Sequence, residues 1–409
     1  MKPELLAPAG TPEKLEVALH FGADAVYLGL KHFSLRSAAG NFTLDELEWA
    51  LRLAHARGRR VYVAVNIQPF DSDLPGVERV LSDLADLGPD AIIVADPGVL
   101  ELCRRRAPAI PLHLSTQASV TNAAAARFWI EQGVRRIIVA RELSLEQLAA
   151  LVASAPGEIE AFVHGAVCIA YSGRCLISLY WADRDPRRGA CAQGCRWRYR
   201  VALEDERRPG LWSPLEQDER GSYFFDALDL CALPVLERLV ATGVRALKIE
   251  GRTRSPLYVG TVVDVYRRAI DLVAAGDLAT LARERPALQA ELLRPVNRGV
   301  STHFLTGDQD APESYNPRGS YADGRARYVG RITERTAEGL LLELRNPLQP
   351  GETLELRDRG LCCEPLRLER LEREDGTSLE AARAGETLLL RGSFRAGPGA
   401  LVRLAPREP

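Results

Sequence analysis

The phrase Gly22-Ala-Asp-Ala-Val-Tyr-Leu28 returns three times along this chain, as Gly88-Pro-Asp-Ala-Ile-Ile-Val94, Gly133-Val-Arg-Arg-Ile-Ile-Val139 and Gly243-Val-Arg-Ala-Leu-Lys-Ile249. In each copy a glycine follows a helical pattern and precedes an apolar run. Glycine just past a helix supplies the left-handed cap, and an apolar run without alternation is typical of a parallel strand covered on both faces. The phrase therefore predicts a strand-and-helix unit that is used repeatedly.

Counting strands by this template gives eight units, which fit a closed TIM-like (β/α)8 barrel of the α/β class. A capping box of Thr43 and Glu46 predicts the start of one of the helices between them. A doubly wound open sheet is the rival fold, but Ala7-Pro-Ala-Gly-Thr-Pro12 is not its G-x-G-x-x-G phosphate loop. The predicted strands are 4–7, 25–28, 61–66, 91–96, 112–115, 137–140, 159–164 and 246–250.

Chain length and turn signals predict two domains. The 409 residues suit a large barrel plus a smaller module. Beyond Tyr321, short alternating runs such as Leu340-Leu-Leu-Glu-Leu344 are separated by turn signals, which predicts a small all-β, barrel-like domain. We expect a barrel domain at 1–300, a linker at 301–320 and a C-terminal β domain at 321–409.

Composition excludes some classes of protein. With 46% hydrophobic and 26% charged residues and a formal net charge of -2, the chain is an ordinary globular protein rather than a generally basic nucleic-acid binder. A local basic patch stays possible. No signal peptide or transmembrane run is evident, so a cytoplasmic location without a membrane partner is expected. The oligomeric state is not predicted.

A cysteine-bearing insertion interrupts the barrel pattern between the seventh and eighth predicted strands, at about 165–235. This loop is long, since such connections usually need only about two to six residues. Its cysteines have the spacing C-x6-C-x15-C-x3-C-x35-C. Long loops at the carboxyl ends of barrel strands are where active sites form, so the cysteines are expected over the site. The cysteines of the insertion are Cys168, Cys175, Cys191, Cys195 and Cys231.

Thiols gathered on a polar loop in a reducing compartment indicate a metal centre rather than disulfides. Four thiolates suit either a [4Fe–4S] cluster or a structural zinc. Zinc sites usually bring cysteines in closely spaced pairs, and only Cys191 and Cys195 have that spacing. The dispersed set therefore favours iron and sulfur over zinc.

Two long motifs resemble the U32 peptidase-like family. They are Glu160-Ala-Phe-Val-His-Gly-Ala-Val-Cys-Ile-Ala-Tyr-Ser-Gly-Arg-Cys-Leu-Ile-Ser178 and Leu247-Lys-Ile-Glu-Gly-Arg252. The opening Glu4-Leu-Leu-Ala-Pro-Ala-Gly10, the stretch Cys191-Ala-Gln-Gly-Cys-Arg-Trp197 and Asp229-Leu-Cys231 are similar to the branch of prephenate-dependent tRNA uridine hydroxylases. That resemblance implies hydroxylation of C5 of the wobble uridine, with prephenate as co-substrate.

The resemblance also implies a [4Fe–4S] cluster on Cys168, Cys175, Cys191 and Cys231, with Cys195 as the spare thiol. It leaves open whether Cys195 takes the place of Cys191. The implied macromolecular partner is the anticodon arm of a tRNA. Basic residues that could contact it are Arg184, Arg187, Arg188, Arg196, Arg198 and Arg200 in the cysteine loop, with Trp181, Trp197 and Tyr199 among them, and Arg325, Arg327 and Arg331 at the start of the β domain. A solvated arginine-rich loop is the alternative.

Polar residues at predicted strand ends complete a pocket. We expect catalysis from His164 and Glu250, and binding of a carboxylic acid substrate from Asn66, Gln117, Arg141, Arg252 and Arg196. A planar guanidinium such as that of Arg252 or Arg141 binds a carboxylate by paired hydrogen bonds. Buried charges also form local ion pairs, so Glu250 and Arg252 could instead serve the fold.

Two other functions stay open at this level. Shorter relatives resembling this family act on a quinone precursor, as iron–sulfur subunits for its oxygen-independent hydroxylation. The predicted β domain favours a macromolecular substrate over that reading. A U32-type peptidase is the third possibility, but the sequence has no H-E-x-x-H motif and no recognisable Ser-His-Asp set.

Overall fold

Eight parallel strands close into a barrel in this computed structural model, which describes residues 2–34, 40–168, 170–171, 173–196, 202–204, 209, 212–214, 227–307 and 326–405. Neighbours pair in chain order, and the last strand pairs with both the first and the seventh, which closes the ring. The barrel strands are β1 (Glu4–Pro8), β2 (Ala25–Gly29), β3 (Arg60–Val65), β4 (Ala91–Val94), β5 (Leu112–Leu114), β6 (Val134–Ile138), β7 (Glu158–Ala166) and β11 (Ala246–Ile249). The predicted TIM-like barrel is confirmed.

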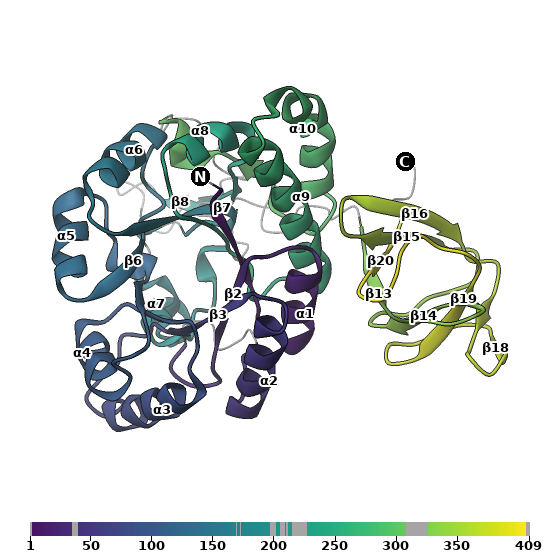
Figure 1. Cartoon of the computed structure of the whole chain (residues 1–409), viewed down its shortest axis with the longest axis horizontal. Helices are drawn as coiled ribbons and strands as arrows, with labels where there is room; N and C mark the ends of the chain where they lie inside the picture. The colour runs from purple at the N-terminus through teal and green to yellow at the C-terminus, as the bar shows by residue number, and fades with distance from the viewer. Residues whose placement is uncertain are drawn as a thin grey trace.

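Helices surround the strands, as Figure 1 shows with the view into the barrel. Thr43 and Glu46 form the expected capping box at the start of α2, with hydrogen bonds of 2.8 and 3.1 Å. Side chains such as Leu47 and Leu51 of α2 are buried against the sheet. The helices are α1 (Pro12–His20), α2 (Leu44–His55), α3 (Leu74–Leu87), α4 (Pro97–Arg106), α5 (Ala123–Glu131), α6 (Leu145–Ser154), α8 (Leu236–Ala241), α9 (Pro256–Ala274) and α10 (Leu278–Leu292).

A β-bulge in β7 decides which side chains enter the barrel mouth. Lys248 of β11 pairs with Phe162, but the next residue, Ile249, pairs with His164. Val163 is therefore an extra residue in β7, and such an insertion reverses the alternation of side chains beyond it. Phe162 keeps the orientation of Lys248, whereas His164 takes that of Ile249.

The cysteine segment, residues 167–235, leaves the barrel at the carboxyl end of β7. It returns as β10 (Asp229–Cys231), which runs antiparallel to β7 and pairs with β12 (Val300–Ser301). Its other described elements are α7 (Ile177–Ala182), the 3-10 turns η3 (Pro186–Arg188), η4 (Gly194–Arg196) and η5 (Leu233–Val235), and the hairpin of β8 (Ala202–Glu204) and β9 (Trp212–Pro214).

The C-terminal region is an antiparallel all-β domain, as expected. Six strands pair in the order β16-β15-β20-β13-β14-β19, and leucines such as Leu342, Leu356 and Leu390 fill a core of their own. The strands are β13 (Tyr328–Arg335), β14 (Gly339–Leu344), β15 (Thr353–Asp358), β16 (Cys362–Arg367), β19 (Thr387–Arg391) and β20 (Leu401–Leu404), with a small ribbon of β17 (Leu371–Glu372) and β18 (Ser378–Leu379).

Buried charges join the β domain to the barrel beside α1, α9 and α10 (Figure 1). Asp264 of α9 accepts the backbone N–H groups of Gly360 at 2.8 Å and Leu361 at 2.9 Å. Arg403 of β20 donates to Glu291 of α10 at 2.6 Å, and its side chain is only 1% exposed. Buried partners of this kind hold two domains at one angle, because separating the domains would leave buried charges without partners.

Two of the arginines proposed for tRNA contact form ion pairs within the chain. Arg331 pairs with Glu16 of α1, across the domain interface, and Arg327 lies 3.4 Å from Glu352. Arg325 lies outside the described residues, as do Trp197, Arg198, Tyr199 and Arg200. Arg331 therefore contributes to the domain interface, and its contact with tRNA stays a prediction.

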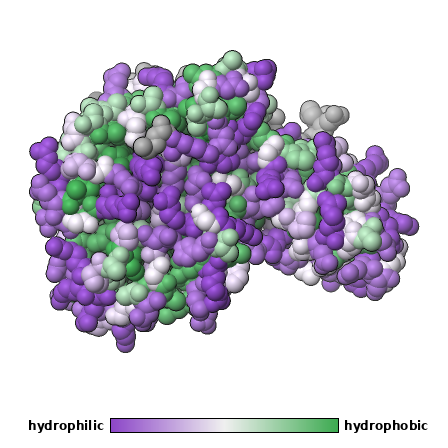
Figure 2. Space-filling model, viewed as in Figure 1, coloured by the Kyte–Doolittle hydropathy of each residue, from purple (hydrophilic) through white to green (hydrophobic). Residues whose placement is uncertain are grey.

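Figure 2 shows a mostly hydrophilic surface on both lobes, with smaller hydrophobic areas over the barrel helices. Within the described ranges, no helix combines the length and the apolar character needed to cross a membrane.

Candidate functional site

A cavity of about 530 Å³ opens at the carboxyl ends of the barrel strands, between the barrel and the cysteine segment. This volume lies within the range of about 300 to 1,000 Å³ that small-molecule sites occupy. Strand ends from β2, β3, β5, β7 and β11 supply its floor and walls, and Cys168, Cys175, Cys191 and Cys195 line its opposite side. The expected position over the barrel mouth is thus observed for four of the five cysteines, all but Cys231.

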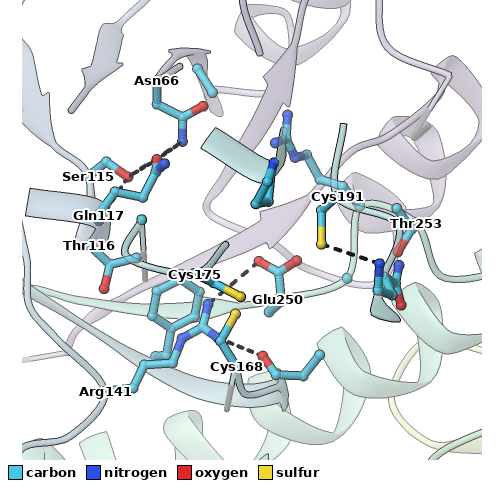
Figure 3. A pocket seen from close by; sticks show the side chains of 18 of the residues that line it. Asn66, Ser115, Thr116, Gln117, Arg141, Cys168, Cys175, Cys191, Glu250 and Thr253 are labelled. Atoms are coloured by element: carbon cyan, nitrogen blue, oxygen red, sulfur yellow. Dashed lines mark hydrogen bonds and ion pairs between the residues drawn. The ribbon is translucent and has the colours of Figure 1, made fainter. Parts of the chain in front are cut away.

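Three polar side chains form one wall of the cavity (Figure 3). Asn66, just beyond β3, donates to the Gln117 side-chain oxygen at 2.7 Å, and the Ser115 hydroxyl donates to the same oxygen at 3.0 Å. The Gln117 Nε2 is buried and has no hydrogen-bond partner among the described residues. This wall therefore holds an amide donor available to a bound polar molecule after small side-chain adjustments.

Arg141 and Glu250 face each other across the cavity. Arg141 Nη2 lies 3.9 Å from Glu250 Oε2, and Nη1 donates to the Ala166 carbonyl at 2.6 Å. The guanidinium also stacks over the Phe162 ring at 3.9 Å, and the Tyr27 hydroxyl lies 3.3 Å from Glu250 Oε2. Both predicted residues therefore lie in the pocket, and Glu250 has a local charged partner, as its ion-pair alternative supposed.

Arg252 lies deep in the cavity wall and is only 4% exposed. Its Nη1 donates to the Ser34 hydroxyl at 2.7 Å, and its backbone carbonyl accepts a hydrogen bond from Lys14 Nζ at 3.0 Å. The loop that carries Arg252 is thus tied to α1. A guanidinium held in this way is oriented before any ligand arrives, which suits recognition of a carboxylate.

Three predicted cluster ligands share the cavity. Figure 3 shows the thiols of Cys168, Cys175 and Cys191 near Glu250 and Arg141. Burial raises the pKa of the Cys175 thiol, and the neighbouring Cys168 and Cys191 raise it further. Neighbouring thiols that resist ionisation by themselves are stabilised as thiolates by a bound metal.

Cys231 lies apart from the other predicted ligands. It is on β10, opposite His164 of β7, with its sulfur 3.8 Å from the Tyr266 hydroxyl, and it does not line the cavity. No three histidine, cysteine or acidic residues are arranged as a metal site within the described part of the chain. The soft thiol donors fit an iron–sulfur cluster chemically, but only Cys168, Cys175, Cys191 and Cys195 share one cavity.

His164 does not face the cavity, contrary to what its position at a strand end suggested. Because of the bulge at Val163, the His164 ring packs behind β7 at 5.6 Å from the Tyr266 ring and 5.9 Å from that of Tyr258. Its residue surface is 1% exposed, and burial lowers its pKa to about 4. We therefore assign His164 to packing and no longer to catalysis.

The Arg196 side chain lies outside the described residues, so its predicted role in binding stays a prediction. Sequence reasoning missed several cavity residues. Lys248 lies on the inward face of β11, and Arg254 and Arg298 converge on the fully buried Asp229 at 2.6 and 3.3 Å. Lys248 could have been found from the sequence, because it alternates with Glu250 along one strand.

Exposed aromatic side chains lie on the cysteine segment beside the cavity. Tyr180 and Trp181 of α7 are 79% and 47% exposed, and Tyr171, which lines the cavity, is 48% exposed. Large aromatic groups rarely stay exposed together on one short segment unless they have a partner. Arg187 and Arg188 nearby are paired with Asp185 and Asp73, at 2.7 and 2.8 Å.

Comparison with known proteins gives consistent results. The model of peptidase family U32 matches residues 10–314. The chain is 38% identical to tRNA hydroxylation protein P of Escherichia coli, over 87% of this chain and 86% of the relative. It is 38% identical to tRNA hydroxylation protein P1 of Bacillus subtilis, over 93% and 90%.

A more distant relative is named for a reaction on another RNA. The 23S rRNA 5-hydroxycytidine C2501 synthase of Escherichia coli is 35% identical over 86% of this chain, but over only 52% of the relative. Among solved structures, the U32 peptidase Mk0906 aligns with 46% of this chain and 74% of its own, at 18% identity and a TM-score of 0.37.

Proposed function

This chain belongs to peptidase family U32, and we propose that it hydroxylates tRNA, at C5 of the wobble uridine, with prephenate as co-substrate. The observation that carries the proposal is the cavity itself. A wall of amides and arginines for a small acid lies opposite several cysteine thiols, at the mouth of a barrel. Relatives that match along most of their own length are named for tRNA hydroxylation.

The cavity argues against the peptidase reading that the family name suggests. No histidine is among its described lining residues, and His164 is turned away by the bulge. A serine or cysteine peptidase needs a base within hydrogen-bond reach of its nucleophile. A thiol whose pKa is raised by partial burial and by neighbouring thiols, as for Cys175, is also a poor nucleophile.

A bound acid would meet groups that are already oriented. In the proposal, Arg252 binds one carboxylate, and Arg141 and the Gln117 amide bind further polar groups of the acid. Glu250, held by Tyr27, is the group positioned to move a proton at the ligand.

We propose Cys168, Cys175, Cys191 and Cys231 as the ligands of a [4Fe–4S] cluster. The shared cavity makes Cys195 the concrete rival to Cys231 for the fourth position. When bound, such a cluster supplies redox-active iron beside the cavity. The proposed roles of Arg252, Arg141, Gln117 and Glu250 are the same whether or not the cluster changes its charge.

The tRNA is expected to approach over the cysteine segment. Tyr171, Tyr180 and Trp181 are exposed there, and stacking of an unpaired base on an aromatic ring contributes about 1 to 3 kcal/mol. An anticodon loop presents unstacked bases of this kind. The exposed rings thus provide a surface on which the wobble base can enter the cavity.

The proposal is tested by nucleoside mass spectrometry of tRNA from cells that lack this gene. Hydroxylated wobble uridine should be absent, and the intact gene should restore it. The double variant Tyr180→Ala, Trp181→Ala should restore much less, with at least tenfold weaker tRNA binding if each ring contributes about 1 kcal/mol. Phe128→Ala, which removes an equally exposed ring from α5, is the matched control and should restore fully. Unchanged tRNA in the deletion strain would refute the proposal.

A further inference from the structure

Lysine is rare in this chain, and its few lysines differ in how deeply they are buried. Of 53 basic residues only four are lysines: Lys2, Lys14, Lys31 and Lys248. Lys2 and Lys31 are exposed, whereas Lys14 and Lys248 are buried. A chain that uses arginine almost everywhere has kept a lysine in its barrel interior. Arginine stays protonated in proteins, but a buried lysine can lose its proton and become a nucleophile.

The two buried lysines have different surroundings. Lys14 donates to the Arg252 carbonyl at 3.0 Å and does not line the cavity. Lys248 lines the cavity, and its Nζ lies 4.2 Å from the centre of the Tyr27 ring. Its one hydrogen bond among the described residues goes to Glu160, at 3.0 Å. An ammonium group carries three N–H donors, so Lys248 can still donate hydrogen bonds on the side that faces the Tyr27 ring and the cavity.

The carboxylate beside Lys248 is shared. Glu160 also lies 3.2 Å from Arg136, whose guanidinium reaches Glu4 at 2.7 Å and Glu158 at 2.8 Å. Glu160 is fully buried, so its second partner weakens its hold on the lysine proton. Burial lowers the pKa of Lys248, Glu160 opposes that change, and the nearby Arg252 charge supports it.

An amine and a carboxylate binder thus border the same aromatic ring. The Arg252 guanidinium carbon lies 5.9 Å from the centre of the Tyr27 ring, on which Lys248 also rests. Glu250 completes the group, since the Tyr27 hydroxyl lies 3.3 Å from its carboxylate. A 2-oxo carboxylic acid carries a carbonyl carbon directly next to its carboxylate. It is the class of ligand whose two neighbouring groups match this pair.

We propose that Lys248 forms an imine with a 2-oxo carboxylic acid whose carboxylate is held by Arg252. The proposal deepens the proposed function, because prephenate is itself a 2-oxo acid. The ammonium first gives a proton to Glu160. The neutral amine then attacks the carbonyl carbon, so that a C–N bond forms, the C=O π bond opens, and a proton moves from nitrogen to oxygen. The proton held by Glu160 returns to the hydroxyl, which leaves as water. The product is a protonated imine, and nothing is oxidised or reduced.

Borohydride trapping of the purified full chain tests this step. The protein is incubated with prephenate or with pyruvate, the smallest stable 2-oxo acid, and reduced with sodium borohydride. Intact mass should show about one reduced acid per chain, as expected of a covalent lysine intermediate. Peptide mapping of the trapped wild-type chain should place the adduct on Lys248, and this measurement requires no variant.

Two variants provide the matched comparison. Lys248→Arg keeps the charge but cannot form an imine, so labelling should fall at least about tenfold. The double variant Lys2→Arg, Lys31→Arg should be labelled like the wild type. Binding of either acid in calorimetry without any adduct, or an adduct at another lysine, would overturn the proposal. If pyruvate is trapped on Lys248 but tRNA hydroxylation is absent, the proposed function fails and the imine stands. If hydroxylation occurs without trapping, the imine fails alone.

Discussion

On the barrel side of the cavity, the polar groups come from strand ends and are held by hydrogen bonds to one another. Asn66, Gln117 and Ser115 bind each other, and Arg141 is fixed between a carbonyl and the Phe162 ring. On the other side, the thiols come from a segment of short turns and one six-residue helix. Cys168, Cys175 and Cys191 are half-buried there, and few core residues support them. One side is assembled by the fold, and the other has the donors for a ligand that would assemble it.

The largest effect is expected from variants that remove thiols on the cysteine side of the cavity. Anaerobically purified protein should contain about four irons per chain, and Cys168→Ala, Cys175→Ala, Cys191→Ala or Cys231→Ala should abolish iron binding. The barrel should stay folded, because most of its core lies on strands and helices outside the segment, which adds only Val167, Leu230, Cys231, Ala232, Leu233 and Val235. Metal analysis and circular dichroism measure the two quantities.

Two further cysteine variants sharpen that comparison. Cys363→Ala removes an exposed thiol of the β domain and should leave the iron content unchanged. Cys195→Ala should also retain the iron. Loss of iron from Cys195→Ala but not from Cys231→Ala would assign the fourth ligand to the cavity thiol. A colourless protein with one zinc would exclude the cluster altogether.

A smaller effect is expected on the barrel side. Arg252→Ala should weaken prephenate binding by roughly 2 to 5 kcal/mol if the contact is a buried ion pair, while the iron content stays constant. Arg188→Ala is the matched control, since it removes an arginine that is paired with Asp73 outside the cavity. Isothermal titration calorimetry gives both affinities. Equal affinities for wild type and Arg252→Ala would leave Arg252 a purely structural role.

The smallest effect concerns the pH dependence of the barrel interior. His113 is 3% exposed, and burial together with the Arg136 charge lowers its pKa well below 6.5. Below pH 6.5 the unfolded chain binds a proton at this imidazole that the folded chain does not. The free energy of unfolding should therefore fall with decreasing pH, by up to about 1.4 kcal/mol per pH unit for this one group.

The matched variant for this prediction is His113→Gln, which cannot titrate. Urea unfolding between pH 7 and pH 5 should show a flatter dependence in the variant, whatever its absolute stability. Parallel curves for the two proteins would mean that His113 is protonated equally in the folded and unfolded chains.

The division into two domains was predictable from the sequence, but the contacts between the domains were not. The change from buried strands to short alternating runs near Tyr321 correctly predicted an all-β domain after a barrel. No sequence pattern indicated that Asp264 and Glu291 of the barrel helices would accept hydrogen bonds from Gly360, Leu361 and Arg403 of the β domain. Their partners lie about a hundred residues away in the chain, and local patterns carry no information on such pairs. Removing the β domain is therefore expected to destabilise the barrel rather than leave it intact.

The sequence by itself determined the eight-stranded barrel, the position of the cysteine segment and the placement of Glu250, Arg252, Arg141, Asn66 and Gln117 at the cavity. These follow from local rules, because glycine caps, apolar runs and the carboxyl ends of parallel strands place residues without knowledge of the rest. Only the tertiary structure decided that the His164 side chain points away from the cavity and which side chains surround Lys248. One extra residue in β7 turned the histidine outward, and closure of the barrel brought the lysine beside Glu160 and Tyr27. Both outcomes depend on strand register, which is set by pairing between distant segments.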